Sequence, residues 1–373
     1  MKRKKHLIVF VPGFFGFKHL GRIAYFSALK QPLVKRLSEK HKVTAKTFVA
    51  KPMPTGAFKV RAQNLLDQSY DEFIHGKYDK IHYIGHSTGG VDIRLALDEK
   101  FELESSRAHI LANSLMRKTL REHLGARVSI AAPHRGTPLA TPFITMGFSV
   151  LPSAASPFFS AIGNVIKQEE AVRRIMKIRL PVDEFRKLNR SMEVSGLTPN
   201  DLGSIVKFVT SIAVDRRAIL GLTPEHMASL NKIQENMGAD DRNCFSIITR
   251  APKPDPEAII HSREKAIEAP TALMYLVLWT VTARFPSNRN FRQIPPSALK
   301  KLGVPENEKP DRHDNDGIVP TLSQPWGKII ALVQADHLDV IGHPEWMNSG
   351  ACFHENEMSK MLDELAECIA SSC

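Results

Sequence analysis

The chain has 373 residues, which is long enough for one large domain with a sizeable buried core. Hydrophobic residues make up 43% of it and charged residues 24%, the balance of a globular protein, and no apolar run reaches the roughly 18 residues of a membrane span. The formal net charge is +12, but the basic residues are dispersed and no nucleic-acid-binding motif appears, so we expect no nucleic-acid partner. Contact with an anionic membrane surface stays open, and the sequence does not indicate an oligomeric state.

The N-terminus imitates a secretory signal, with basic Lys2–Lys5 followed by the apolar run Leu7–Val11. A proline and a glycine interrupt this run at once, and no A-x-A-like cleavage site follows, so we interpret Leu7–Val11 as the first strand. The four cysteines lack metal-type spacing and are too few for a disulfide scaffold, although a Cys352–Cys368 bond stays open. These features predict a cytoplasmic protein, with peripheral membrane contact as a variant.

Apolar runs typical of buried strands alternate with segments of helical spacing in the first 138 residues and again near the C-terminus. The predicted elements are, in order, Leu7–Val11, Ala24–Glu39, Val43–Val49, Phe58–Ile74, Ile81–Gly85, Gly90–Lys100, Arg107–His123, Arg127–Ala132, Cys244–Thr249, Thr271–Ala283, Lys328–Val333 and Met358–Ala370. The apolar helix Thr271–Ala283 is too short to span a membrane and is predicted to be a core helix. The alternation predicts an α/β fold with a mostly parallel sheet and helices on both faces.

The alternation stops between residues 139 and 239. Within this block, Ile205 to Ala213 carries one apolar stripe at helical spacing. A block of this size inserted after a strand is typical of a lid, so we predict a catalytic core of residues 1–138 and 240–373 with a helical lid or cap at 139–239. A separate helical domain with its own role is the alternative.

The stretch Ile81–Gly90 reads I-H-Y-I-G-H-S-T-G-G and predicts a strand, a sharp turn and a helix. Ser87 lies at the turn with Gly85 and Gly89 on either side, where the chain comes too close to itself for larger side chains. Such a turn exposes the serine hydroxyl at the sheet edge, above a helix N-terminus that favours negative charge. Ser87 is therefore the predicted nucleophile.

A serine nucleophile needs a base within hydrogen-bond reach and a carboxylate that orients the base. In a parallel sheet these groups meet only if each follows the C-terminal end of a strand. Asp316 lies in a tight turn before Gly317 and is the predicted acid, with Asp311 and Asp314 as rivals. His337 follows the last predicted strand and is the predicted base, which completes the chain order Ser, Asp, His.

Two other histidines are alternatives to His337 as the base. His86 is next to Ser87 but is predicted to point the other way on the turn, in a structural role. His134 lies in another loop and is the main rival of His337.

Hydrolysis by a serine also needs donors for the oxyanion, which supply about 3 kcal/mol for one donor. The residue after the nucleophile gives one backbone N–H, at Thr88, and the loop after the first strand gives the other, at Phe14. Gly13 would let this loop approach the nucleophile; the alternative is that it is an ordinary turn glycine.

Four motifs together resemble the bacterial true-lipase family of α/β-hydrolases. They are G-H-S-T-G-G at 85–90, A-P-H-R-G-T-P at 132–138, N-D-G-I-V-P at 315–320 and H-L-D at 337–339. The resemblance implies an α/β-hydrolase fold and a carboxylic-ester hydrolase acting on acylglycerols or similar apolar esters, with no required cofactor. Many members hold a structural calcium through the aspartate of H-L-D, which is Asp339 here, but His343 replaces its usual glutamine companion. In that family the loop before the oxyanion residue usually carries His-Gly, whereas this chain has Pro12-Gly13 there.

Three functions are compatible with these residues. The preferred one is a lipase or carboxylesterase that works through an acyl-enzyme, with activity that falls as His337 takes up a proton. An acyltransferase on the same site differs only in the acceptor of the acyl group. A non-catalytic, membrane-associated protein is the alternative from another class.

Overall fold

The computed structural model describes residues 5–14, 19–20, 23–53, 56–99, 101–103, 107–140, 217–236, 243–253, 275, 278–280, 282–283, 293–342 and 353–372. Its centre is a six-stranded sheet in the order β4-β1-β5-β6-β7-β8. The strands are β1 (Lys5–Val11), β4 (Thr44–Val49), β5 (Lys80–His86), β6 (Leu124–Ile130), β7 (Cys244–Arg250) and β8 (Lys328–Gln334). All neighbouring pairs are parallel, so the six strands end at the same edge of the sheet. The short strands β2 (His19–Leu20) and β3 (Ile23–Ala24) form a separate antiparallel pair.

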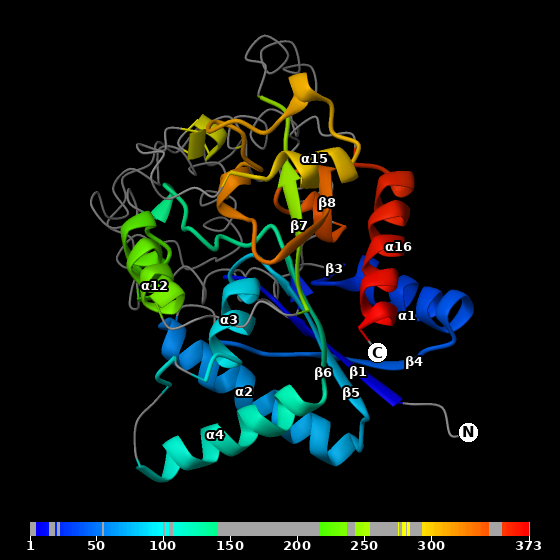
Figure 1. Ribbon diagram of the computed structural model, residues 1–373, viewed down its shortest axis with the longest axis vertical. Helices are drawn as coiled ribbons and strands as arrows, with labels where there is room; N and C mark the ends of the chain where they lie inside the picture. Colours follow the sequence, from blue (N-terminus) through cyan, green and yellow to red (C-terminus); the bar gives the residue numbers. More distant parts are fainter. Residues whose placement is uncertain are drawn as a thin grey trace, which may run out of the picture.

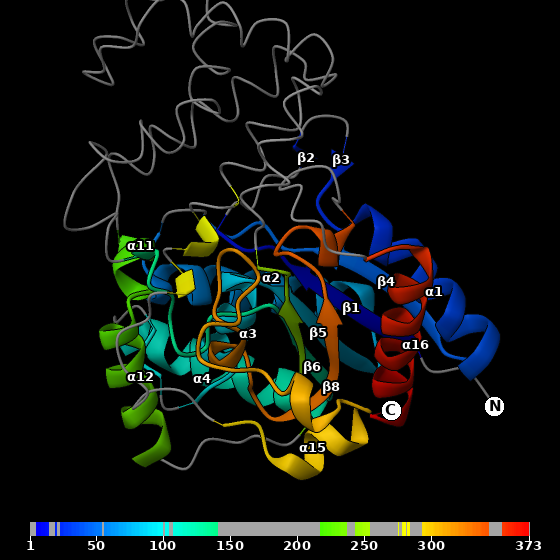
Figure 2. The same cartoon turned by 90° about the horizontal axis from the view of Figure 1, so that it is seen from above.

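Helices cover both faces of the sheet, as the sequence predicts (Figures 1 and 2). One face carries α1 (Ser27–His41) and α16 (Glu355–Ser371), and the other carries α2 (Phe58–Gly76), α3 (Thr88–Ala96) and α4 (Arg107–Glu122). Strand β1 shows how the two layers arise from the pleat, because its successive side chains point to opposite faces. Leu7, Val9 and Val11 pack in the cluster beneath α2 and α3, whereas Ile8 and Phe10 pack beneath α1 and α16.

Several element boundaries differ from the predicted ones, and two of them lie beside turns. The helix after the serine turn begins at Thr88, not at residue 90, because Ser87 itself is its N-cap. Strand β6 begins at Leu124, which pairs with Ile81, and it ends before Ala131, whose φ of 51° leaves the extended region.

The predicted lid is described only at residues 139–140 and 217–236; the rest lies outside the described residues. The described part contains α11 (Arg217–Gly221) and α12 (Pro224–Asn236). Ile219, Leu222, Met227 and Leu230 belong to the same buried cluster as Leu7. This end of the block therefore packs on the same apolar cluster as strand β1.

The apolar segment 271–283 is described at residues 275, 278–280 and 282–283, all of them helical. The Tyr275 hydroxyl donates to the Pro252 carbonyl at 2.7 Å, and the Thr282 hydroxyl donates to the Gly317 carbonyl at 3.2 Å. Both side chains are buried, as expected of a core helix. Within the described ranges, no helix is both long and apolar enough to cross a membrane.

The two cysteines among the described residues, Cys244 and Cys368, are both buried.

Candidate active site

Ser87 lies at the junction of β5 and α3, at the edge where the parallel strands end. Its backbone has φ 55° and ψ −131°, a conformation that costs energy for any residue with a side chain. The Ser87 N–H donates to the Ile130 carbonyl at the end of the neighbouring strand, at 2.9 Å. This is the strained strand-to-helix turn that the sequence predicts.

Glycines around Ser87 allow close contacts that a Cβ would prevent. A Cβ on Gly85 would lie 2.6 Å from the Gly89 carbonyl carbon. A Cβ on Gly13 would lie 2.6 Å from Cβ of Ser87 and 3.1 Å from its Oγ. Since Gly13 is not among the residues with positive φ, the close approach to Ser87 is what requires glycine there. The loop that carries Phe14 thus passes directly beside the serine.

Asp316 and His337 form a buried hydrogen-bonded pair. Oδ2 of Asp316 lies 2.9 Å from Nδ1 of His337, and the His337 N–H donates to the Asp316 carbonyl at 3.0 Å. The other carboxylate oxygen accepts hydrogen bonds from the backbone N–H groups of Ile318 and Val319, at 3.0 and 2.7 Å. Both side chains are essentially inaccessible, at 0% and 1% exposure. The carboxylate is therefore held in one orientation toward the imidazole.

The rival acids are occupied elsewhere. Asp314 lies 3.4 Å from the Arg250 guanidinium and accepts a hydrogen bond from the Asp311 N–H. Asp311 is exposed and accepts from the His313 N–H. Of the three candidates, the structure pairs Asp316 with His337.

The two rival histidines have different surroundings. His86 is fully buried, its Nε2 lies 2.8 Å from the His337 carbonyl oxygen, and the two rings lie 4.6 Å apart. The structure thereby places His337 against the residue that precedes Ser87. His134 packs against Trp326, and neither ring nitrogen has a hydrogen-bond partner among the described residues. Burial, followed by nearby Arg94 and Arg135, holds the pKa of His134 well below its usual range.

A buried ion pair contacts the serine turn through Thr88, and the sequence did not predict it. Arg61 of α2 and Asp92 of α3 are both fully buried, with Nη2 and Oδ2 2.6 Å apart. Burial raises the pKa of Asp92, and Arg61 opposes that rise. The same Nη2 donates to the Thr88 hydroxyl at 3.3 Å, so the pair ties α2 to the proposed oxyanion residue. A charged residue within the apolar stripe of each helix is the only sequence signal for it.

Two further polar residues near the acid were also missed. The Thr249 hydroxyl, at the end of β7, donates to Oδ2 of Asp316 at 2.7 Å. The Gln324 side chain accepts from the Thr249 N–H at 2.7 Å and holds this threonine in place. A threonine at the end of an apolar strand is too common for the sequence to single it out.

Asp339, the calcium candidate, is buried in the turn that follows His337. Asp336 N–H donates to Oδ2 of Asp339, and Oδ1 of Asp336 accepts from the N–H groups of Leu338 and Asp339. Within the described part of the chain, no three His, Cys, Asp or Glu side chains lie close enough together to hold a metal ion. His343, which stands where the usual glutamine companion is expected, lies outside the described residues.

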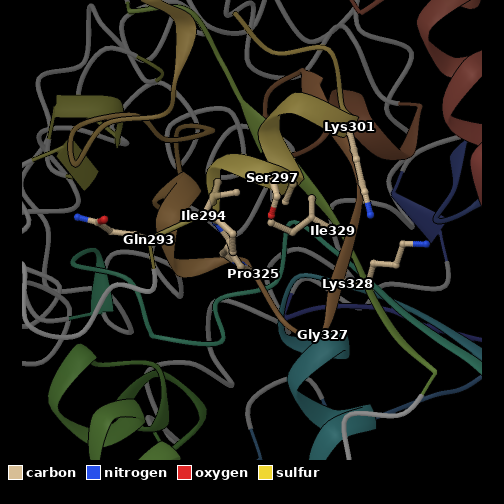
Figure 3. A pocket seen from close by; sticks show the side chains of 10 residues that line it. Gln293, Ile294, Ser297, Lys301, Pro325, Gly327, Lys328 and Ile329 are labelled. Atoms are coloured by element: carbon tan, nitrogen blue, oxygen red, sulfur yellow. The ribbon is translucent and has the colours of Figure 1, made fainter. Parts of the chain in front are cut away.

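A separate cavity lies between α15 (Pro296–Lys301) and the start of β8 (Figure 3). Ile294 and Ile329 line it, and Lys301 and Lys328 extend along one side of it. His337 follows the other end of the seven-residue strand β8, which at about 3.3 Å per residue places it roughly 20 Å away. This cavity is therefore not part of the candidate active site.

Comparison with known proteins gives a consistent fold. The model of the family described as "Putative serine esterase (DUF676)" matches residues 1–166, which include Phe14, Ser87 and Thr88. Lipase 1 from Pelosinus fermentans has a similar structure, with a TM-score of 0.51, 17% identity, and coverage of 98% of this chain and 99% of that chain. None of the curated proteins matches the chain.

Two other solved structures are more distant. The metagenomic carboxyl esterase MGS0156 matches with a TM-score of 0.49 and 15% identity, over 100% of this chain and 77% of that chain. Staphylococcus hyicus lipase matches with a TM-score of 0.45 and 15% identity, over 98% and 94%. The chain has an α/β-hydrolase fold, and its first 166 residues are similar to a family of serine esterases.

Proposed function

We propose that this protein is a serine hydrolase that cleaves carboxylic esters. Ser87 is the nucleophile, His337 the base and Asp316 the group that orients the base, while the N–H groups of Phe14 and Thr88 bind the oxyanion. The observation that carries the proposal is the buried pair of Asp316 and His337, held beside the strained turn of Ser87.

The direction of the acid–base hydrogen bond follows from its chemistry. A carboxylate can only accept, so Nδ1 of His337 carries the hydrogen that Oδ2 of Asp316 receives. In an uncharged ring this leaves Nε2 as the acceptor, ready to take the proton of the Ser87 hydroxyl. The tautomer that this bond favours is thus the one that a general base requires.

The proposed reaction has two halves. Ser87 Oγ bonds to the ester carbonyl carbon while its proton passes to His337, and the tetrahedral intermediate then expels the alcohol, which takes that proton. Water attacks the acyl-enzyme in the same way and releases the carboxylic acid and the free serine. Neither half needs a cofactor, and no step involves a metal.

The oxyanion donors follow from the position of the turn. Thr88 is the first residue of α3, where backbone N–H groups have no partner within the helix and favour negative charge. Phe14 follows Gly13, the residue in contact with Ser87. Each donor aimed at the developing charge is worth about 3 kcal/mol.

Apolar esters are the proposed substrates. Phe14 packs partly buried against the apolar cluster beneath α2 and α3, which puts an apolar surface beside the serine. The similar solved structures are a lipase and a carboxyl esterase by name. The predicted lid is proposed to shelter the acyl chain, through phenylalanines at 143–148 and 158–159 that lie outside the described residues.

The decisive experiment compares the enzyme with Ser87→Ala. Hydrolysis of p-nitrophenyl esters of short, medium and long acyl chains, with and without a lipid surface, should be abolished while the far-UV circular dichroism is unchanged. A fluorophosphonate probe should label the unchanged enzyme and the control Ser229→Ala, which alters an exposed serine of α12, but not Ser87→Ala. Undiminished hydrolysis by Ser87→Ala would reject the proposed nucleophile. An added alcohol that captures the acyl group would identify acyl transfer.

A further inference from the structure

A continuous chain of buried hydrogen bonds connects the loop beside Ser87 to the proposed base. The Gly13 N–H lies 3.2 Å from the Tyr25 hydroxyl oxygen, which lies 2.6 Å from Nδ1 of His86. Nε2 of His86 lies 2.8 Å from the His337 carbonyl oxygen. Tyr25, His86 and His337 are all buried, so these bonds are shielded from competition with water. Three segments far apart in the sequence are thus joined at the site.

The protons in this chain can be arranged in only one way for an uncharged His86. The His337 carbonyl oxygen can only accept, so Nε2 of His86 carries the hydrogen. Nδ1 then has none and must accept from the Tyr25 hydroxyl, whose oxygen in turn accepts from the Gly13 N–H. Burial raises the pKa of Tyr25 far above its usual value, so the phenol keeps the proton it donates.

One end of the chain acts on the oxyanion loop. Because the Gly13 N–H is directed at Tyr25, the next amide in the loop, at Phe14, is the one proposed to bind the oxyanion. A Cβ at Gly13 would clash with Ser87, so a small displacement of this loop changes the distance between the donor and the reacting oxygen. Donors are effective only when they are positioned before the charge develops.

The other end acts on the base. Asp316 holds His337 through two bonds, one to its N–H and one to Nδ1. Both bonds connect His337 to the turn that carries Asp316, and neither connects it to the serine turn. Among the described residues, His86 connects His337 to the serine turn through its Nε2, and its ring packs against the His337 ring at 4.6 Å.

We infer that Tyr25 and His86 are positioning residues that set the oxyanion loop and the base relative to Ser87 at the same time. This inference rests on the proposed function. It predicts a defect in catalysis, with little change in substrate binding, when one of these hydrogen bonds is removed.

The kinetic test uses the entire protein chain of 373 residues with the substitution Tyr25→Phe, which removes one hydroxyl from a buried ring. We expect kcat for a p-nitrophenyl ester to fall about tenfold, the effect of one lost hydrogen bond, with KM within about twofold. Inhibition by an alkyl boronic acid, which forms a tetrahedral adduct with the serine, should weaken by a similar factor. The matched control is Tyr83→Phe, which alters another buried tyrosine, on β5 and outside this chain of hydrogen bonds. A loss of thermal stability in Tyr25→Phe without a loss of kcat would overturn the inference.

Variants of His86 test the other end. His86→Leu removes both bonds, whereas His86→Gln keeps an amide N–H that can donate to the His337 carbonyl. We expect His86→Gln to recover part of the kcat lost in His86→Leu. Because Tyr25 and His86 act in one chain, adding Tyr25→Phe to His86→Leu should cost much less than Tyr25→Phe alone. Fully additive losses would contradict a shared function.

A measurement without substrate separates this inference from the proposed function. The ¹⁵N spectrum of the imidazoles should show His86 as the neutral Nε2–H tautomer, and Tyr25→Phe should shift its Nδ1 resonance. The Nδ1–H tautomer would refute the chain of bonds even if the enzyme hydrolyses esters. If the protein shows the expected tautomer but no Ser87-dependent hydrolysis, the proposed function is refuted, and so is the catalytic role inferred for Tyr25 and His86. The hydrogen bonds themselves would then still be supported.

Discussion

Two pairs of buried histidines lie at opposite ends of β5 and differ in their partners. Near the start of the strand, Nε2 of His82 lies 3.0 Å from Nδ1 of His6, and the rings stack 5.2 Å apart. At its end, His86 packs against His337. All four rings are buried, so burial does not distinguish the pairs.

The difference lies in whether a carboxylate is in contact. Nδ1 of His82 accepts from the Ala126 N–H, and burial, then His6 and Lys80, lower the pKa of His82 to about 3. Nδ1 of His337 instead lies 2.9 Å from Oδ2 of the Asp316 carboxylate, to which its N–H can donate. Among the described residues, His82 thus contacts an imidazole and a backbone N–H, whereas His337 contacts a carboxylate.

The largest effect should come from removing that carboxylate charge. Asp316→Asn keeps the shape of the side chain but can donate to His337, which favours the wrong tautomer. We expect kcat for ester hydrolysis to fall by on the order of 10⁴-fold. The matched control is Asp314→Asn, which changes the neighbouring carboxylate paired with Arg250 and should leave kcat within about twofold. Similar losses of kcat in both variants would show that the contact between the Asp316 carboxylate and His337 has no special role in catalysis.

The second prediction concerns acid stability at the other pair. The folded pKa of His82, about 3, lies below the ordinary value of about 6.5, so between these limits the unfolded chain binds a proton that the native chain does not. Stability is therefore lost as the pH falls from about 6.5 to about 3, with a slope of at most about 1.4 kcal/mol per pH unit from this group.

Urea unfolding of His82→Gln across that pH range measures this term. The variant should lose stability less steeply with acid than the unchanged chain, while its kcat at neutral pH is retained. An unaltered slope would mean that His82 takes up a proton as readily in the folded state as in the unfolded one.

The smallest effect should come from Thr249, whose hydroxyl donates to the Asp316 carboxylate. Thr249→Val removes one hydrogen bond to Oδ2 of Asp316 in a side chain of similar shape. We expect kcat to fall about tenfold or less, as for one lost hydrogen bond. Thr119→Val, which removes a hydroxyl bonded to its own helix, is the control and should not change kcat. No change in Thr249→Val would show that the backbone donors of Ile318 and Val319 suffice to hold the carboxylate.

The sequence by itself determined the features that depend on neighbours along the chain. Apolar runs and helical spacing predicted the elements of the α/β fold, since the pleat and the helical turn repeat over a few residues. The serine turn was predicted for the same reason, because Gly85 and Gly89 act on atoms only a few positions away. Asp316 and His337 could be proposed because each follows a strand at the shared edge, and their catalytic roles stay a prediction.

Tertiary structure decided everything that depends on contacts between distant segments. The choice of Asp316 over Asp311 and Asp314 rests on a hydrogen bond to a histidine 21 positions later. The chain from Tyr25 through His86 to His337 and the buried pair of Arg61 and Asp92 left no distinctive local pattern. Hydrogen bonds of this kind form only after the sheet has brought remote loops to one edge, because no spacing along the chain encodes which buried polar groups will meet there.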